Sequence, residues 1–530
     1  MPAMSPTRRI FLRQLGLGAG GWFLLPSLWP ALGAADLKDL PRSTPEAQGV
    51  STAGILAFLD AIAHSRHALH SFMFARHGQV IAEGWWTPYA SDLNHGLYSL
   101  SKSFTSTAVG FAVAEGKLTV EDKVTSFFPD DLPDPVSENL AALRVKDLLT
   151  MSVGHAVEPL LEMVKVENWA KAFLAWPIAN PPGSQFLYNS GATYMLSAIV
   201  QRLAGEPILS YLTPRLFTPL GIEGMTWETC PRGINTGGWG LSLRTEALAK
   251  FGQLYLQRGQ WKGQQLLPAK WIEEATTFKI QEPAPAKPTR PSEKNDWLQG
   301  YCYQFWRSTH QAYRGDGAFG QFMIVMPEQD AVVAITAETH DIQNELDLVW
   351  EHLLPAIKEA PLPADAEMQA QLQRALNVLV LNPAKAQPTS PTADRVSGKT
   401  YRLAANDLGL ESVVFEFQNN PGKVTFHGGQ TDYPVSFGIE KWQRGETALP
   451  GTPPRLISGG AWKAGAPAKV AASGTWKGED TFEMTWRYIE TPHHDTVTCQ
   501  FTDDDLHISF LSSIAQPGKD KRPELQGRIA

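Results

Sequence analysis

The spacing of hydrophobic residues divides the 530-residue chain into regions of different character. A helical pattern covers Thr52–His64, and a hairpin pattern follows in Phe72–Arg76 and Val80–Trp85, with a turn at His77-Gly78. Residues 100–275 predict mostly helices and long loops. Strands are expected again at Tyr301–Trp306, Phe322–Met326 and Ala331–Thr336, followed by a helix from about Asn344 to Ile357.

A different pattern begins after residues 382–394, a stretch rich in Pro, Ala, Ser and Thr. Beyond it, hydrophobic residues alternate or cluster as in antiparallel strands, and four tryptophans are available to fill a small barrel or sandwich. We therefore predict a first domain over 40–380 with an exposed loop at 283–296, a linker over 381–395 and a β-rich domain over 396–530. The predicted strands are Val413–Phe417, Thr481–Ile489, Thr496–Phe501 and Leu506–Leu511, and the tryptophans are Trp442, Trp462, Trp476 and Trp486.

Composition indicates a large folded protein. Hydrophobic residues make up 43% of the chain, with 17 Trp and 24 Phe, which argues against extensive disorder. The formal net charge is −8 and the pI is near 5.9, without a basic stripe. We therefore expect no nucleic-acid partner.

The N-terminus carries the pattern of an export signal. Residues Thr7–Arg13 resemble the twin-arginine consensus, and a weakly hydrophobic, glycine-rich run follows at Leu15–Leu25. The alternative is a membrane anchor, but this run is short and interrupted by glycines. We predict a twin-arginine signal peptide over residues 1–35, a periplasmic or secreted protein, and no stable membrane insertion after cleavage. Small residues that offer cleavage sites are Ala31, Gly33, Ala34 and Ala35.

Cysteine and histidine patterns give no metal motif. Cys230, Cys302 and Cys499 are odd in number and include no C-x-x-C, so we expect buried apolar side chains rather than a disulfide framework or a zinc site. The run His493-His494-Asp495 could suggest a metal, but adjacent side chains on a strand point to opposite faces. We predict no metal and no cofactor.

One short motif carries candidate chemistry. Ser99 and Lys102 form the only S-x-x-K of the chain, at the start of a predicted helix. This spacing puts hydroxyl and amine on one helical face, and the helix N-terminus favours negative charge that develops on Ser99 during attack. A lysine with a depressed pKa can remove the serine proton. The pair is therefore a candidate nucleophile and base, the alternative being a capping serine beside a solvated lysine.

Two further motifs lie downstream. Phe186–Gly191 contains Tyr188 at a predicted loop–helix junction, where a phenol can relay a proton; a buried core tyrosine is the alternative. Gly315–Gln321 leads into a predicted strand, and its glycines would let a substrate carbonyl approach an edge strand; a hairpin glycine cluster is the alternative.

Together, these three motifs and their order resemble the β-lactamase-related serine hydrolases, which include class C β-lactamases, D-alanyl-D-alanine carboxypeptidases, esterases and 6-aminohexanoate-dimer hydrolases. The phrases Leu148–His155, Gly237–Ser242 and Phe251–Leu256 fit as well, so the resemblance covers about residues 45–358. It implies an α+β (α/β) serine β-lactamase or penicillin-binding-protein fold, with an antiparallel sheet and a helical insertion, followed here by an all-β C-terminal domain.

The resemblance also implies roles for single residues. Ser99 would be the nucleophile, Lys102 the base and Tyr188 the proton relay, while the backbone N–H groups of Ser99 and Ala318 would form the oxyanion hole. Ser190, Asp316 and Gly317 would bind substrate.

Two departures from the family pattern bear on the substrate. Ser190 stands where the family has Asn, and Gly315-Asp316-Gly317 replaces a Lys or His, Thr or Ser, Gly motif whose first two residues hold a substrate carboxylate. Asp316 should repel such a carboxylate unless Arg314 compensates. We therefore expect an acyl-enzyme hydrolase of neutral or cationic carboxylic esters or small amides.

Two alternatives remain open. One is a β-lactamase or D,D-carboxypeptidase acting on penicillin or peptidoglycan substrates. The other is a non-catalytic cell-wall-binding or sensor protein on the same scaffold. The C-terminal domain could cover the site, mediate dimerisation, bind a polymer or serve structure alone. Neither the natural substrate nor the oligomeric state follows from the sequence.

Overall fold

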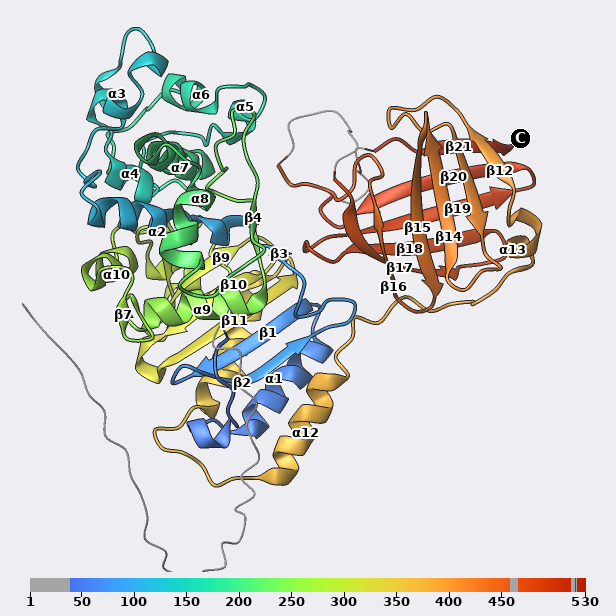
Figure 1. Cartoon of the computed structure of the whole chain (residues 1–530), viewed down its shortest axis with the longest axis horizontal. Coiled ribbons are helices and arrows are strands. Elements are labelled where there is room, and N and C mark those ends of the chain that lie inside the picture. The colour runs from blue at the N-terminus through green and yellow to red at the C-terminus, as the bar shows by residue number, and fades with distance from the viewer. Residues whose placement is uncertain (1–38, 458–465, 516–519, 521) are drawn as a thin grey trace, which may run out of the picture. The chain divides into compact units, whose positions relative to one another are not determined.

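A six-stranded antiparallel sheet organises the region that precedes the C-terminal β-rich domain (Figure 1), in the order β2-β1-β11-β10-β9-β8. The computed structural model describes residues 39–457, 466–515, 520 and 522–530. The predicted signal peptide and Trp462 lie outside these residues. The strands are β1 (Ala68–Arg76), β2 (Gln79–Trp85), β8 (Trp306–Arg307), β9 (Tyr313–Gly317), β10 (Gln321–Met326) and β11 (Ala331–Glu338).

Both faces of this sheet are covered. Side chains alternate along a strand, so Phe72 and Phe322 enter one hydrophobic cluster while Met73 and Met323 enter another. Helices α1 (Thr52–His64), α11 (Ile342–Leu348) and α12 (Ala366–Asn377) belong to the first cluster, and α9 (Thr245–Leu256) packs on the opposite face (Figure 1). Double burial explains why the central strands β10 and β11 are hydrophobic at nearly every position.

The helical part lies between the first two strands and β8 in sequence. Its main helices for the site are α2 (Ser101–Ala114) and α7 (Ser190–Ala204), which pack against each other. Smaller elements complete it: α3 (Glu138–Ala142), α4 (Val145–Leu149), α5 (Leu160–Met163), α6 (Trp169–Ala175), α8 (Ile208–Leu212), α10 (Ala269–Thr276), β3 (His95–Gly96), β4 (Thr226–Trp227), β5 (Leu241–Leu243), β6 (Gln260–Trp261) and β7 (Gln264–Gln265).

The predicted helices and strands exist, with two differences near the site. Ser99 lies in a 3₁₀ turn, Tyr98–Leu100, that leads directly into α2, so it precedes the α-helix rather than opening it. The expected strand Tyr301–Trp306 shrinks to β8, because the chain turns where Cys302 N–H donates to the Phe305 carbonyl and Gln304 takes a φ of 64°.

The C-terminal region forms a closed barrel. Ten strands pair in the order β15-β14-β13-β12-β21-β20-β19-β18-β17-β16, and a parallel pairing of β15 with β17 closes the sheet. The strands are β12 (Thr400–Leu403), β13 (Ser412–Glu416), β14 (Gly422–Gly428), β15 (Thr431–Ile439), β16 (Gln443–Thr447), β17 (Ala468–Trp476), β18 (Thr481–Tyr488), β19 (His494–Thr502), β20 (Asp505–Ser512) and β21 (Leu525–Ile529).

Two expectations for this region need correction. Trp476 and Trp486 fill the barrel core, but Trp442 lies outside it, where its indole N–H donates to the Leu381 carbonyl at 2.6 Å. His493 and His494 do not diverge, because His493 belongs to the turn before β19, and Nδ1 of each ring faces Glu338 at 3.5 and 2.6 Å.

A short helix, α13 (Pro391–Val396), begins inside the stretch predicted as a linker, and Ser390 is its N-cap.

The remaining sequence expectations concern cysteines and membranes. All three cysteines are buried and unpaired, as expected for apolar core side chains. Among the described residues, no helix is both long and apolar enough to span a bilayer.

Candidate active site

Ser99 and Lys102 face each other across one helical turn. Lys102 Nζ lies 3.0 Å from Ser99 Oγ, within hydrogen-bond distance. The lysine is 2% exposed, whereas Ser99 is half-buried and so remains accessible from solvent. The S-x-x-K spacing thus produces the contact that the sequence predicted.

Two other elements complete the surroundings of the lysine. Its Nζ lies 3.1 Å from Ser190 Oγ at the start of α7 and donates to the Gly238 carbonyl at 2.8 Å. Burial lowers the pKa of Lys102 to about 7, although the charges of Glu158 and Asp316 raise it in part. A lysine with this pKa is partly neutral near pH 7 and can accept a proton.

Tyr188 lies beside this pair because the chain turns inward just before α7. Asn189 caps the helix through its side-chain oxygen, which accepts from Ala192 N–H at 3.0 Å. The Tyr188 ring stacks on Trp306, and Lys102 Nζ lies 4.7 Å from its centroid. Burial raises the pKa of Tyr188 well above its usual range, and a hydrogen bond with Ser99 lowers it in part. Tyr188 is therefore a neutral phenol in contact with the candidate nucleophile.

Strand β9 approaches the Ser99 turn so closely that only glycine fits. A Cβ on Gly317 would lie 2.1 Å from the Leu97 carbonyl oxygen, and one on Gly315 would lie 2.8 Å from Ser103 Oγ. These glycines therefore let the strand pack on the turn that carries Ser99, a role that the sequence reasoning did not foresee. Substrate binding by Gly317, and the pairing of Ala318 with Ser99 in an oxyanion hole, remain predictions.

Asp316 is not an isolated negative charge. Its carboxylate lies 3.1 Å from the guanidinium of Arg314, which is fully buried. Burial raises the pKa of Asp316, while Arg314 lowers it. The compensation by Arg314 that the sequence left open is therefore present.

Two further carboxyl groups, which the sequence reasoning missed, lie in the same region. Glu158 accepts a short hydrogen bond from Ser190 N–H. Glu282 interacts with Asp316: burial and the charge of Asp316 raise the pKa of Glu282 to about 7, and Arg314 opposes the shift. Neither residue belongs to one of the sequence motifs, and each lies in a loop. Gly238, whose carbonyl accepts from Lys102, does lie in a segment that the sequence singled out, Gly237–Ser242. That family resemblance was the signal by which this contact could have been found.

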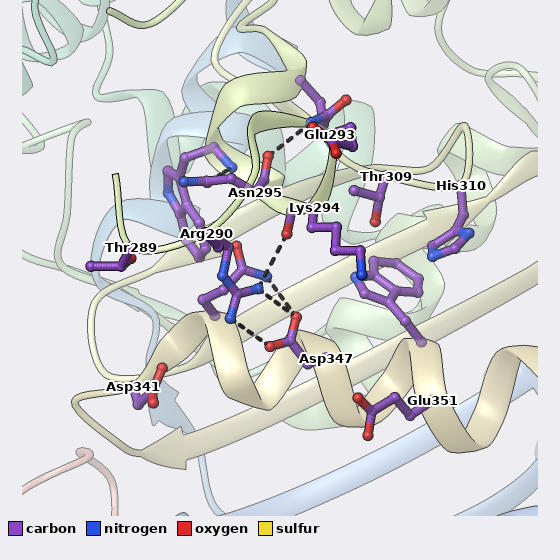
Figure 2. A pocket seen from close by; sticks show the side chains of 14 residues that line it. Thr289, Arg290, Glu293, Lys294, Asn295, Thr309, His310, Asp341, Asp347 and Glu351 are labelled. Atoms are coloured by element: carbon purple, nitrogen blue, oxygen red, sulfur yellow. Dashed lines mark hydrogen bonds and ion pairs between the residues drawn. The ribbon is translucent and has the colours of Figure 1, made fainter. Parts of the chain in front are cut away.

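A separate cleft of about 1050 Å³ lies between residues 289–299 and α11 (Figure 2). Arg290 and Asp347 form an ion pair at 2.8 Å along it. Trp297 also lines it and packs 4.4 Å from the guanidinium of Arg314. Because Ser99, Lys102 and Tyr188 do not line this cleft, it is distinct from the candidate active site.

Comparisons with known proteins show which family the hydrolase region belongs to. The family model described as Beta-lactamase matches residues 63–351. The chain is 25% identical over 283 residues to the 6-aminohexanoate-dimer hydrolase of Paenarthrobacter ureafaciens, covering 50% of this chain and 71% of that protein. It is 26% identical over 136 residues to a beta-lactamase of Escherichia coli (strain K12), covering 26% of this chain but only 35% of that protein. A solved family VIII carboxylesterase matches 60% of this chain and 99% of its own, with a TM-score of 0.47 and 17% identity.

The chain belongs to the beta-lactamase family, because the matched region exceeds half of its length. It is a serine hydrolase on a β-lactamase and penicillin-binding-protein-like fold, followed by a C-terminal β domain. The resemblance, the fold class and the enzyme class predicted from sequence are confirmed.

Proposed function

We propose that the protein is an exported serine hydrolase that cleaves a carboxylic ester or a small amide through an acyl-enzyme on Ser99. The observation that carries this proposal is the buried Lys102, whose pKa of about 7 and 3.0 Å distance from Ser99 Oγ suit a general base.

In the first step, Ser99 Oγ attacks the substrate carbonyl carbon while its proton passes to Lys102 Nζ. The carbonyl oxygen gains negative charge, which the N–H groups of Ser99 and Ala318 would stabilise. Tyr188 then relays the proton to the leaving oxygen or nitrogen as that bond to the carbonyl carbon breaks. Attack by water on the acyl-enzyme reverses these roles, releases the acid and restores the Ser99 hydroxyl.

The charges near Ser99 support a neutral or cationic substrate. Glu158 and Asp316 are both close enough to raise the pKa of Lys102, and Glu282 adds a third carboxyl near Asp316. Arg314 is committed to Asp316 and does not offer a free positive charge to a substrate carboxylate. The relative named 6-aminohexanoate-dimer hydrolase supports the amide half of the proposal.

The β-lactamase or D,D-carboxypeptidase alternative is supported by the match to a beta-lactamase, but Gly315 and Asp316 replace the residues that would hold the substrate carboxylate. A non-catalytic wall-binding or sensor role would leave the intact Ser99, Lys102 and Tyr188 without a purpose. We further propose export by the twin-arginine route to the periplasm or beyond, on the strength of Arg8 and Arg9.

The test is the intact mass of the purified protein after treatment with a fluorophosphonate probe. Wild type should gain one adduct, and Ser99→Ala should gain none. Ser106→Ala is the matched control, since Ser106 lies on α2, which continues from the Ser99 turn, and its buried hydroxyl has no hydrogen-bond partner among the described residues. Turnover of p-nitrophenyl esters, short amides and nitrocefin then ranks the substrate classes. Equal labelling of wild type and Ser99→Ala would remove Ser99 from the mechanism.

A further inference from the structure

A turn of the C-terminal barrel contacts the residue that precedes the candidate nucleophile. The hydroxyl of Tyr98 and Nε2 of His493 share a hydrogen bond of 2.5 Å, although 395 residues separate them in sequence. His493 is 1% exposed. Two neighbouring contacts hold the same turn in place, since Gly96 N–H donates to the Glu490 carbonyl at 2.9 Å and the Tyr89 hydroxyl donates to the Thr491 carbonyl at 3.2 Å.

The same histidine also packs on the other side of the site. The ring of Phe319, which follows Ala318, lies edge-on to His493 with centroids 4.7 Å apart. Phe319 also contacts Tyr98, at 5.4 Å between centroids. His493, Tyr98 and Phe319 therefore form one aromatic cluster, and its two members from the hydrolase region each adjoin a residue whose N–H is assigned to the oxyanion hole.

The backbone at both positions needs external support. Tyr98 has a φ of 47° and Phe319 a φ of 68°, values that bulky side chains rarely adopt. Such conformations carry an energetic cost and persist only where surrounding contacts fix them. The contacts with His493 supply part of that fixation.

His493 is itself anchored by the hydrolase sheet. Its Nδ1 lies 3.5 Å from Glu338 at the end of β11, and its backbone N–H donates to Thr491 Oγ1 at 3.1 Å. Burial raises the pKa of Glu338, but hydrogen bonds from His493 and His494 and the charge of Arg487 outweigh burial and hold it far below the usual range. The ionised carboxylate favours a proton on His493 Nδ1, which leaves Nε2 to accept from the Tyr98 hydroxyl.

We propose that His493 is a positioning residue for the reaction: the barrel supplies it to fix Tyr98 and Phe319, and through them the backbone N–H groups of Ser99 and Ala318. The active site is then a composite of both regions of the chain. This inference rests on the proposed function, because it assumes attack by Ser99, and it adds a role for the C-terminal domain that the sequence left open.

The test compares variants of the full-length protein by the second-order rate of fluorophosphonate inactivation and by kcat and KM on p-nitrophenyl butyrate. His493→Ala should lower the inactivation rate and kcat by about 10- to 100-fold with little change in KM, the range expected from a misplacement on the order of 1 Å. His493→Gln, which can still accept from Tyr98, should recover part of the loss. Tyr98→Phe keeps the ring but removes the hydroxyl, so its effect and that of His493→Ala should overlap rather than multiply.

Arg444→Ala is the matched control. Its guanidinium donates to the Pro88 carbonyl at 2.6 and 3.1 Å, so the variant loses a barrel-to-hydrolase contact of similar kind away from Tyr98. It should keep the wild-type inactivation rate.

Wild-type inactivation rates in folded His493→Ala would overturn the inference. Should that variant fail to fold, wild-type rates in Tyr98→Phe would overturn it equally. Either outcome is distinct from failure of the proposed function, which would appear as labelling of wild type that does not depend on Ser99.

Discussion

Arg314 and Asp316 lie two residues apart on β9, and their side chains form an ion pair at 3.1 Å with the arginine fully buried. A buried ion pair gains little net stability, but removing one partner leaves an uncompensated charge. In the proposed site, a substrate would therefore meet a pair that is neutral overall when intact and a cation when Asp316 is replaced by a neutral residue.

We predict that Asp316→Asn shifts substrate preference toward acyl groups with a carboxylate near the scissile bond. Two charges about 4 Å apart interact by about 4 kcal/mol at an effective dielectric near 20. A quarter of this energy corresponds to about a fivefold change in the relative rates of two substrates. The ratio of kcat/KM for nitrocefin to that for p-nitrophenyl butyrate should therefore rise at least about fivefold.

Glu282→Gln is the matched control for this shift, because it removes a nearby carboxyl and leaves Arg314 paired. The ratio of kcat/KM for nitrocefin to that for p-nitrophenyl butyrate should change less in Glu282→Gln than in Asp316→Asn. Introducing a positive charge by Gly315→Lys would not test the same idea cleanly. A Cβ at this position would lie 2.8 Å from Ser103 Oγ and would disturb the packing of β9. An unchanged ratio in Asp316→Asn, or a wild type that hydrolyses nitrocefin as well as the ester, would refute the argument about substrate charge.

The pKa of Lys102 predicts the pH dependence of the reaction. The base must be neutral, so kcat/KM should fall as pH decreases through about 7, where Lys102 gains a proton. Glu282 also has a pKa of about 7, so the profile is best measured in Glu282→Gln, where the acidic limb should persist.

Glu158→Gln gives the decisive shift in this profile. The negative charge of Glu158 raises the pKa of Lys102, so its removal should move the acidic limb to lower pH. If the acidic limb stays in place or moves to higher pH, the group that titrates there is not Lys102.

Lys102→Ala and Tyr188→Phe should each lower kcat by about 10²–10⁴, the range for general acid–base groups. Because both contact Ser99 and act in one proton network, their combined loss should be much smaller than the product of the single losses. The double variant measures this directly. A fully multiplicative loss would show that the two residues act independently.

Gly317→Ala should destabilise the protein by about 1–3 kcal/mol, the usual cost of overpacking, because its Cβ would overlap the Leu97 carbonyl. The displaced turn carries Ser99, so kcat should fall as well. Gly445→Ala is the control, since a Cβ there meets no atom within 4 Å. Urea unfolding and ester turnover measure the two effects, and wild-type behaviour of Gly317→Ala would contradict the close approach of β9.

Replacement of Arg8 and Arg9 by lysine should retain the protein in the cytoplasm, because the paired arginines are the element that the export receptor reads. Fractionation followed by immunoblotting measures the distribution. The wild-type protein, with both arginines intact, serves as the control, and normal periplasmic yield of the Lys-Lys variant would indicate another route or no export signal.

Much of the fold was predictable because it follows from local periodicity. Helix Thr52–His64 and the hairpin around His77-Gly78 fall where the hydrophobic spacing put them. The strand predicted at Tyr301–Trp306 failed because Gln304 adopts a left-handed conformation that no local pattern announced. Trp442 was assigned to the barrel core on residue type alone, and its position depends on a hydrogen bond to Leu381, far away in sequence.

The sequence by itself determined the relationship of Ser99 and Lys102, because residues three apart in a helical turn must share a face. Only the tertiary structure decided what surrounds them. The Gly238 carbonyl reaches Lys102 across 136 residues, and His493 reaches Tyr98 across 395. Contacts of this kind depend on how whole elements pack, and the periodicity of a single segment contains no information about the partner that packing brings to it.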